Sequence, residues 1–150
     1  MSRSPVVIGL DEQAERPVEI TTWVELARDV LVAEGIDDEA ELNLLFVGDG
    51  EMAELNRTHM GSSGPTDVLS FPLDDQHELV EEGQPRLLGD VVICPAVVAG
   101  QAVAGFDDEM ALMVVHGVLH ILGMDHAEPD DAEAMKAAEG RHLERWQESR

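Results

Sequence analysis

The chain has 150 residues, of which 44% are apolar, and a chain of that length buries roughly two-thirds of its unfolded surface in one domain. Its 9 basic residues stand against 32 acidic ones, a net charge of −23, which excludes a protein that holds nucleic acid by charge alone. One cysteine excludes a disulfide framework, and no apolar run reaches the ~18 residues of a membrane span. The N-terminal apolar stretch is too short for a secretory signal. We therefore expect one domain, residues 1–150, in the cytoplasm.

Strands and helices alternate along the predicted chain. Alternating or β-rich apolar runs predict four strands, at 6–10, 41–47, 67–71 and 88–94. Helical spacing and stop signals predict five helices: Thr22 to Gly35, Asp49 toward Arg57, Pro95 to Ala104, a cap at Asp107 or Asp108 through to Gly123, and Asp130 to Trp146. The segment GSSGP and the acidic stretch between the last two strands are predicted loops. This order favours an α+β fold, with a small mixed sheet covered by helices.

The helix predicted over 108–122 is apolar nearly all round, which is typical of a buried helix. It nevertheless carries His116 and His120, whose spacing of four residues places both imidazoles on one face. Gly123 can turn the chain sharply at the helix end, and His126 follows three residues later. Either each imidazole is hydrogen-bonded within the core, or the three converge on a metal ion.

The spacing of these histidines, with glycine at the turn, is the ligand spacing of the metzincin metallopeptidases, which predicts a zincin-like arrangement. Three neutral imidazoles with an open fourth position are typical of catalytic zinc, so we expect one Zn²⁺ per chain. Those peptidases carry a glutamate directly after the first histidine as general base, whereas this chain has Gly117. The pattern therefore predicts either a different scissile bond or a base supplied from elsewhere.

The segment His116 to His126, HGVLHILGMDH, resembles the signature of the YbeY family of bacterial metal-dependent endoribonucleases. Further matches follow the family order: Leu55-Asn56, the segment 65–71 (PTDVLSF) and Leu88-Gly89-Asp90. The resemblance implies zinc on the three histidines, a single hydrolase domain, and phosphodiester cleavage in ribosomal RNA during its maturation.

One position departs from the family pattern. Many members have an arginine five residues before the Pro-Thr-Asp segment, proposed to hold the scissile phosphate, and this chain has Met60 there. Arg57, about one helical turn earlier, is a candidate replacement, with a solvent-facing side chain as the alternative. Asp125 either orients an imidazole as a hydrogen-bond acceptor or caps the turn with its own side chain.

Other polar side chains near the motif are weaker candidates. His59 is a possible proton carrier, although a surface histidine is the commoner case. The carboxylates of Asp67 and Asp90, on the predicted strands, are expected either to face the cleft or to pair with the backbone.

The strong negative charge conflicts with binding bare RNA, because phosphate contacts normally come from lysine and arginine. We therefore expect ribosomal RNA to be reached through docking on the small ribosomal subunit or on a ribosomal or assembly protein, with neither DNA nor membrane as a partner. Two alternatives remain: a zinc metallopeptidase, and a non-enzymatic ribosome-assembly factor whose metal is structural.

Overall fold

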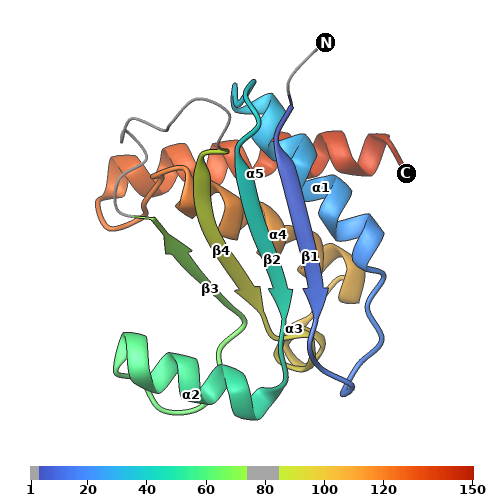
Figure 1. Cartoon of the computed structure of the whole chain (residues 1–150), viewed down its shortest axis with the longest axis vertical. Helices are drawn as coiled ribbons and strands as arrows, with labels where there is room; N and C mark the ends of the chain where they lie inside the picture. The colour runs from blue at the N-terminus through green and yellow to red at the C-terminus, as the bar shows by residue number, and fades with distance from the viewer. Residues whose placement is uncertain (1–3, 74–84) are drawn as a thin grey trace.

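The computed structural model describes residues 4–73 and 85–150, and in this part of the chain it contains four strands and five helices (Figure 1). The strands are β1 (Val6–Asp11), β2 (Glu41–Phe46), β3 (Val68–Pro72) and β4 (Leu87–Ile93). The helices are α1 (Ile20–Ala33), α2 (Asp49–Met60), α3 (Pro95–Gln101), α4 (Phe106–Ile121) and α5 (Pro129–Glu148).

The four strands form one sheet in the order β1-β2-β4-β3. β2 is parallel to both of its neighbours, β1 and β4, whereas β3 lies antiparallel to β4 at one edge. Leu42, Leu44 and Phe46 of β2 are fully buried, and the residues between them are half-buried. That period of two gives the sheet one face that packs against helices. The predicted α+β fold with a small mixed sheet is thereby confirmed.

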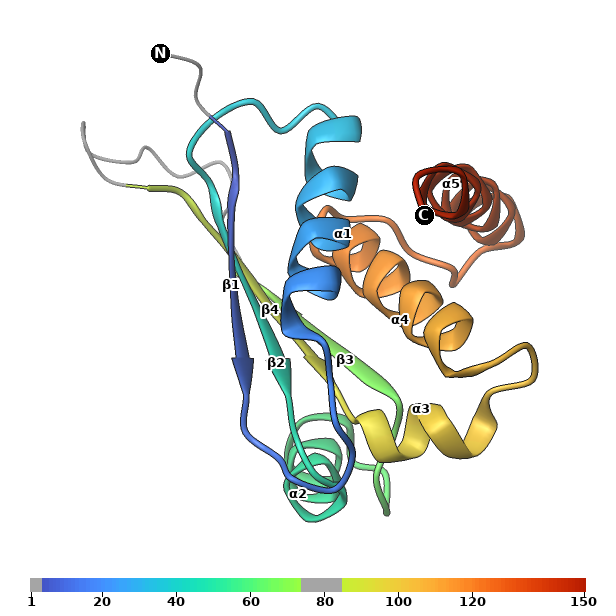
Figure 2. The ribbon, with the colours of Figure 1, turned by 90° about the vertical axis from the view of Figure 1, so that its right-hand side faces the viewer.

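The helices lie mainly on one side of the sheet, in two layers (Figure 2). α1 and α4 cover the sheet, and α5 packs on the outside of these two helices. α4 therefore lies between the sheet and α5. Most of the apolar side chains of α4 have no exposed surface, which confirms that the helix with the histidines is buried. A smaller core forms where α2 packs near β3 and β4: Val47, Met52, Leu69, Val92 and Cys94.

Some predicted element ends differ from those in the structure. α4 begins at Phe106 and its N-cap is Gly105 (φ 111°), so the prediction that Asp107 or Asp108 caps this helix is wrong. Glycine adopts a positive φ without steric cost and lets the chain enter the helix earlier. Both acids lie in the first turn, where they still favour the helix dipole.

The end of α3 also differs from its predicted position. α3 ends at Gln101 and not at Ala104, because Ala102 adopts an extended conformation (ψ 131°). The predicted acidic loop between β3 and β4 falls largely on residues 74–84, which lie outside the described residues.

Candidate metal centre

The first two candidate ligands project from the same face of α4. The ring centroids of His116 and His120 are 4.6 Å apart and the rings meet edge to face. Because one helical turn separates them, the helix alone sets this spacing. The predicted placement on one face is confirmed.

A tight turn after α4 brings the third histidine back to the first two. Gly123 adopts φ 98°, and the N–H of Met124 donates to the carbonyl of Leu119 at 3.0 Å, which closes a Schellman motif. The ring of His126 then lies 5.7 Å from that of His116 and 5.2 Å from that of His120, between centroids. The turn predicted at this glycine therefore forms.

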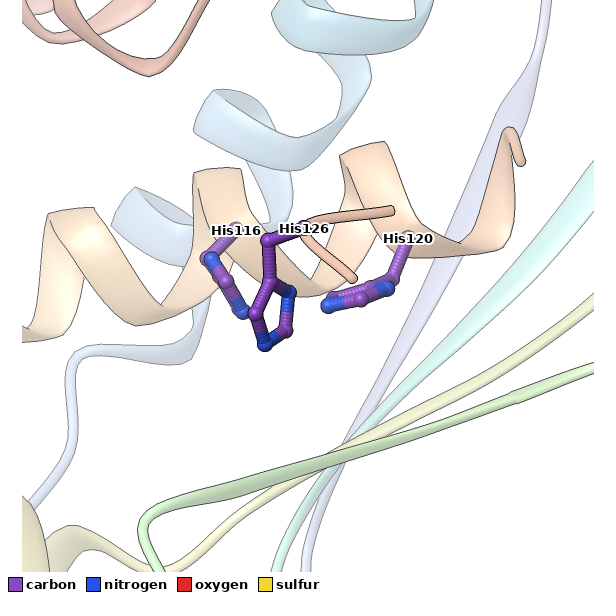
Figure 3. A group of neighbouring side chains, drawn as sticks. All are labelled: His116, His120 and His126. Atoms are coloured by element: carbon purple, nitrogen blue, oxygen red, sulfur yellow. The ribbon is translucent and has the colours of Figure 1, made fainter. Parts of the chain in front are cut away.

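The three imidazoles converge on one point (Figure 3). One ring nitrogen from each of His116, His120 and His126 lies within 4.8 Å of the other two. The pKa of His120 is lowered from its usual value, first because burial penalises the charged ring and then because the other two histidines repel a positive charge. A neutral imidazole offers a lone pair, which is the state a metal ligand requires. The donor set therefore fits a divalent ion.

A carboxylate from α5 contacts the first histidine, and sequence reasoning missed it. The Nδ1 atom of His116 lies 2.9 Å from Oε1 of Glu139, and only 16% of the Glu139 side chain is exposed. Several acids share α5 with Glu139, and no local spacing distinguishes it from them. Only the packing of α5 against α4 identifies this residue.

The histidines line one wall of a cavity of about 510 Å³. The other walls come from the end of α2, from β3 and the residue before it, from the first half of α4 and from α5: Met60, Asp67, Val68, Leu69, Ser70, Pro72, Leu112, Met113 and Glu139. Among the described residues, neither lysine nor arginine lines the cavity. Met113 belongs to the main hydrophobic core and Leu112 packs against it, and both side chains also line the cavity.

Polar contacts of Asn56 and Asp67 hold the loop before β3 in place. The side-chain amide of Asn56, only 7% exposed, donates to the carbonyl of Gly64 at 2.9 Å. Asp67 accepts the N–H of Val68 at 2.7 Å and the amide of Gln101 at 2.9 Å. Asp67 therefore both faces the cavity and pairs with the backbone.

The other predicted polar residues lie outside the cavity lining. Asp90 accepts a hydrogen bond from the amide of Asn43 at 2.9 Å, and His59 is an exposed residue whose ring contacts Phe71 edge to face. Arg57 forms an ion pair with Glu54 on the same helix, and the two side chains are 66% and 65% exposed. The position of Met60, and not that of Arg57, is the one that α2 brings to the cavity.

Asp125 contacts the backbone of the turn next to the third histidine. Its carboxylate accepts the N–H of His126 at 2.6 Å. Asp125 therefore supports the third candidate ligand through the backbone, whereas the carboxylate that contacts an imidazole ring is Glu139.

Gly117 lies where α4 approaches the sheet most closely. A Cβ atom at this position would be 2.6 Å from Cγ1 of Val91 and 3.3 Å from Cγ2 of Val68. The hydroxyl of Ser70 also donates to the carbonyl of Gly117 at 3.0 Å. The packing that places the histidines over β3 thus leaves no room for the glutamate that metallopeptidases carry here.

The fold and the site together define an α+β protein with a three-histidine candidate metal centre on a buried helix and the turn that follows it. A family model described as "Endoribonuclease YbeY" matches residues 10–147. The chain therefore belongs to the Endoribonuclease YbeY family.

Individual relatives are similar in sequence to this protein over most of the chain. The Endoribonuclease YbeY of Salinispora tropica is 43% identical over 153 residues, covering 95% of this chain and 98% of the relative. The protein of the same name from Acidothermus cellulolyticus is 46% identical over 136 residues, which cover 85% and 83% of the two chains. A solution structure of a Thermotoga maritima protein superposes with a TM-score of 0.62 at 27% identity, covering 95% of this chain and 90% of that one.

Within the described part of the chain, the helices lack the combination of length and apolar content that crossing a membrane requires.

Proposed function

We propose that the protein is a zinc-dependent endoribonuclease that cleaves single-stranded segments of ribosomal RNA during rRNA maturation and ribosome quality control. The observation that carries this proposal is the cluster of three imidazoles at the wall of a cavity of about 510 Å³. The names of the relatives support RNA as the substrate.

In this proposal His116, His120 and His126, which line the cavity, would hold one Zn²⁺. A divalent ion supplies Lewis-acid chemistry there, since it activates water and stabilises negative charge on a phosphodiester. Burial and the two neighbouring histidines lower the pKa of His120, which favours the neutral form of this ligand. Asp125 holds the backbone of His126 and therefore acts as a positioning residue.

The surroundings of Gly117 favour a phosphodiester over a peptide bond. Peptide hydrolysis at a three-histidine zinc site uses a glutamate directly after the first ligand as general base. Here a side chain at that position would meet Val91. Zinc hydrolysis of a peptide would therefore need a base that the cavity wall supplies elsewhere.

The proposal is tested by metal content and by cleavage together. We expect one equivalent of zinc in the purified protein and none in the triple variant His116→Ala, His120→Ala, His126→Ala. Single-stranded ribosomal RNA should be cut by the wild type and spared after chelation, whereas an unfolded protein substrate should stay intact. Cleavage of the protein substrate alone would support a peptidase. A folded His116→Ala protein that still corrects rRNA maturation in cells would assign the metal a structural role.

The net charge of the protein favours a docking partner that helps to bind the RNA substrate. The chain carries −23, and the described cavity lining contributes neither lysine nor arginine, so phosphate contacts beyond the metal are few. We therefore propose docking on the small ribosomal subunit, or on a ribosomal or assembly protein, in the cytoplasm. A filter-binding titration that gives a submicromolar Kd for bare RNA at physiological salt would remove the need for that partner.

The phosphate-binding role predicted for Arg57 requires its side chain to leave Glu54 and turn toward Met60. An Arg57→Ala variant tests it by comparison with Arg28→Ala on α1. A selective rise in KM for RNA in Arg57→Ala would support the role, and equal kinetics in the two variants would exclude it.

A further inference from the structure

The carboxylate of Glu139 contacts Nδ1 of His116 and lines the same cavity as the three histidines. We infer that Glu139 is a positioning residue that fixes both the orientation and the tautomer of His116. This inference rests on the proposed metal site, and it assigns a role to a residue of α5 that lies 23 positions along the chain from the histidine it serves.

The contact engages one particular nitrogen of the ring. Nδ1 of His116 and Oε1 of Glu139 are 2.9 Å apart, and the two side chains are 25% and 16% exposed. A hydrogen bond that is largely shielded from water holds its geometry better than one on the surface. With Nδ1 engaged by Glu139, Nε2 is the nitrogen left for the cluster with His120 and His126.

The chemistry of the pair decides where the proton lies. A carboxylate accepts hydrogen bonds and donates none, and a neutral imidazole carries one N–H. The proton of His116 must therefore be on Nδ1, which leaves the Nε2 lone pair free for a metal. In water a neutral histidine favours the opposite tautomer, with its proton on Nε2. Glu139 therefore selects the ligating tautomer before any ion binds.

The packing of α5 keeps Glu139 in place. Met135 and Ala138 of this helix are buried in the main core, and farther along the helix Trp146 packs on Trp23 of α1 with ring centroids 5.8 Å apart. Among the described residues, His116 is the one ion-pair partner within reach of Glu139. The Glu139 carboxylate can therefore accept the hydrogen bond of His116 without competition from another ion-pair partner in the described part of the chain.

A second histidine-glutamate pair on α5 provides a matched control. Nε2 of His142, which is 3% exposed, lies 2.7 Å from Oε2 of Glu34 at the end of α1. This pair has the same chemistry as the Glu139 pair, but His142 does not belong to the three-histidine cluster. Loss of its carboxylate removes one contact of the same kind elsewhere on α5, and the other packing contacts of this helix should keep Glu139 and the metal affinity unchanged.

The experiment compares Glu139→Ala, Glu139→Gln and Glu34→Ala with the wild type in two measurements. In a chelator competition we expect zinc affinity to fall about 10- to 100-fold in Glu139→Ala. The loss should be smaller in Glu139→Gln, whose carbonyl oxygen still accepts the Nδ1 proton, and Glu34→Ala should stay within about twofold of wild type. In metal-free protein above pH 8, ¹⁵N NMR should show the His116 proton on Nδ1 in the wild type and on Nε2 in Glu139→Ala.

Equal zinc affinity in Glu139→Ala and wild type, or an Nε2 proton on His116 in the wild type, would overturn the inference while leaving the proposed function intact. A wild-type protein that binds no zinc would overturn both. If Glu139→Ala does not fold, the zinc affinity of Glu139→Gln and the tautomer of His116 in the wild type still test the inference.

Discussion

Gly117 connects the packing of the core with the chemistry of the site. Its neighbour His116 is a candidate ligand, and the absence of its own side chain lets α4 approach β4. In the sequence Gly117 indicates only that a general base is missing. In the structure it is also a contact point, because Val91 and Val68 occupy the space that a Cβ atom would need.

We therefore expect Gly117→Ala to destabilise the protein. Alanine stabilises a helix by about 1 kcal/mol relative to glycine, whereas overpacking a core costs about 1–3 kcal/mol. The free energy of unfolding should therefore fall by an amount on the order of 1 kcal/mol. Val91 is fully buried and β-branched and cannot move aside easily. Urea unfolding measures the change. Gly140→Ala, where a Cβ atom meets nothing within 4 Å, is the control and should be stabilised. A Gly117→Ala protein as stable as Gly140→Ala would contradict the close packing.

Cys94 is the other residue whose chemistry follows from burial. It has no exposed surface, and its thiol donates to a carboxylate oxygen of Asp49 at 3.1 Å. Burial, followed by the negative charges nearby, raises the pKa of this thiol to about 11.

The native thiol should therefore resist alkylation. With that pKa, on the order of one molecule in a thousand carries the reactive thiolate at pH 8. We expect iodoacetamide to label Cys94 only after addition of denaturant. Mass spectrometry of the native and the denatured protein measures the extent of labelling. Rapid labelling of the native protein at pH 8 would show that the smaller core opens readily.

At the scale of elements, α4 and α5 contribute different residues to the candidate metal site. α4 and the turn after it carry the three histidines, and α5 supplies the carboxylate that contacts the first of them. α5 is attached to α1 through Trp146, whose ring lies 5.8 Å from Trp23 at an angle of 35° and is also covered by the guanidinium of Arg150.

Removing that aromatic contact should loosen α5. We expect Trp146→Ala to lower the free energy of unfolding by about 3 kcal/mol, since tryptophan truncation in a core costs about 3–5 kcal/mol and Trp146 retains 9% exposure. Val103→Ala, at a side chain that is 97% exposed, should change stability by less than about 0.5 kcal/mol. Thermal and urea unfolding of both variants measure the difference. Similar stabilities would mean that α5 docks through other contacts.

The whole molecule presents a strongly negative surface to a polyanionic substrate. With a net charge of −23 and a cavity lining that contributes neither lysine nor arginine among the described residues, a metal ion held by the three histidines would be the main positive charge at the site. Most RNA-binding proteins release counterions from phosphates and bind more weakly as salt rises.

For this protein we expect the salt dependence to be flat or inverted. Raising KCl from 50 to 200 mM should leave the affinity for a bare single-stranded RNA unchanged or improve it, because salt screens the repulsion between protein and RNA. Fluorescence anisotropy with zinc-loaded protein measures this dependence, and a basic RNA-binding protein serves as the control. A steep loss of affinity, by a thousandfold or more, would reveal a cationic RNA path that the cavity lining does not supply.

The local sequence determined the ligand trio, because everything that brings His116, His120 and His126 together lies within eleven residues. Helical periodicity sets the first two, and a glycine that adopts φ 98° sets the return of the third. The strands, the loop at 61–65 and the buried helix were predictable for the same reason, since each depends on neighbours in the chain.

The tertiary structure alone decided what surrounds those ligands. Glu139 reaches His116 because α5 folds back on α4, and Met60 enters the cavity because α2 ends beside β3. The predicted replacement, Arg57, lies on the same helix but pairs with Glu54 in solvent. Residues far apart in the sequence meet only through the packing of whole elements, and no local spacing encodes that packing.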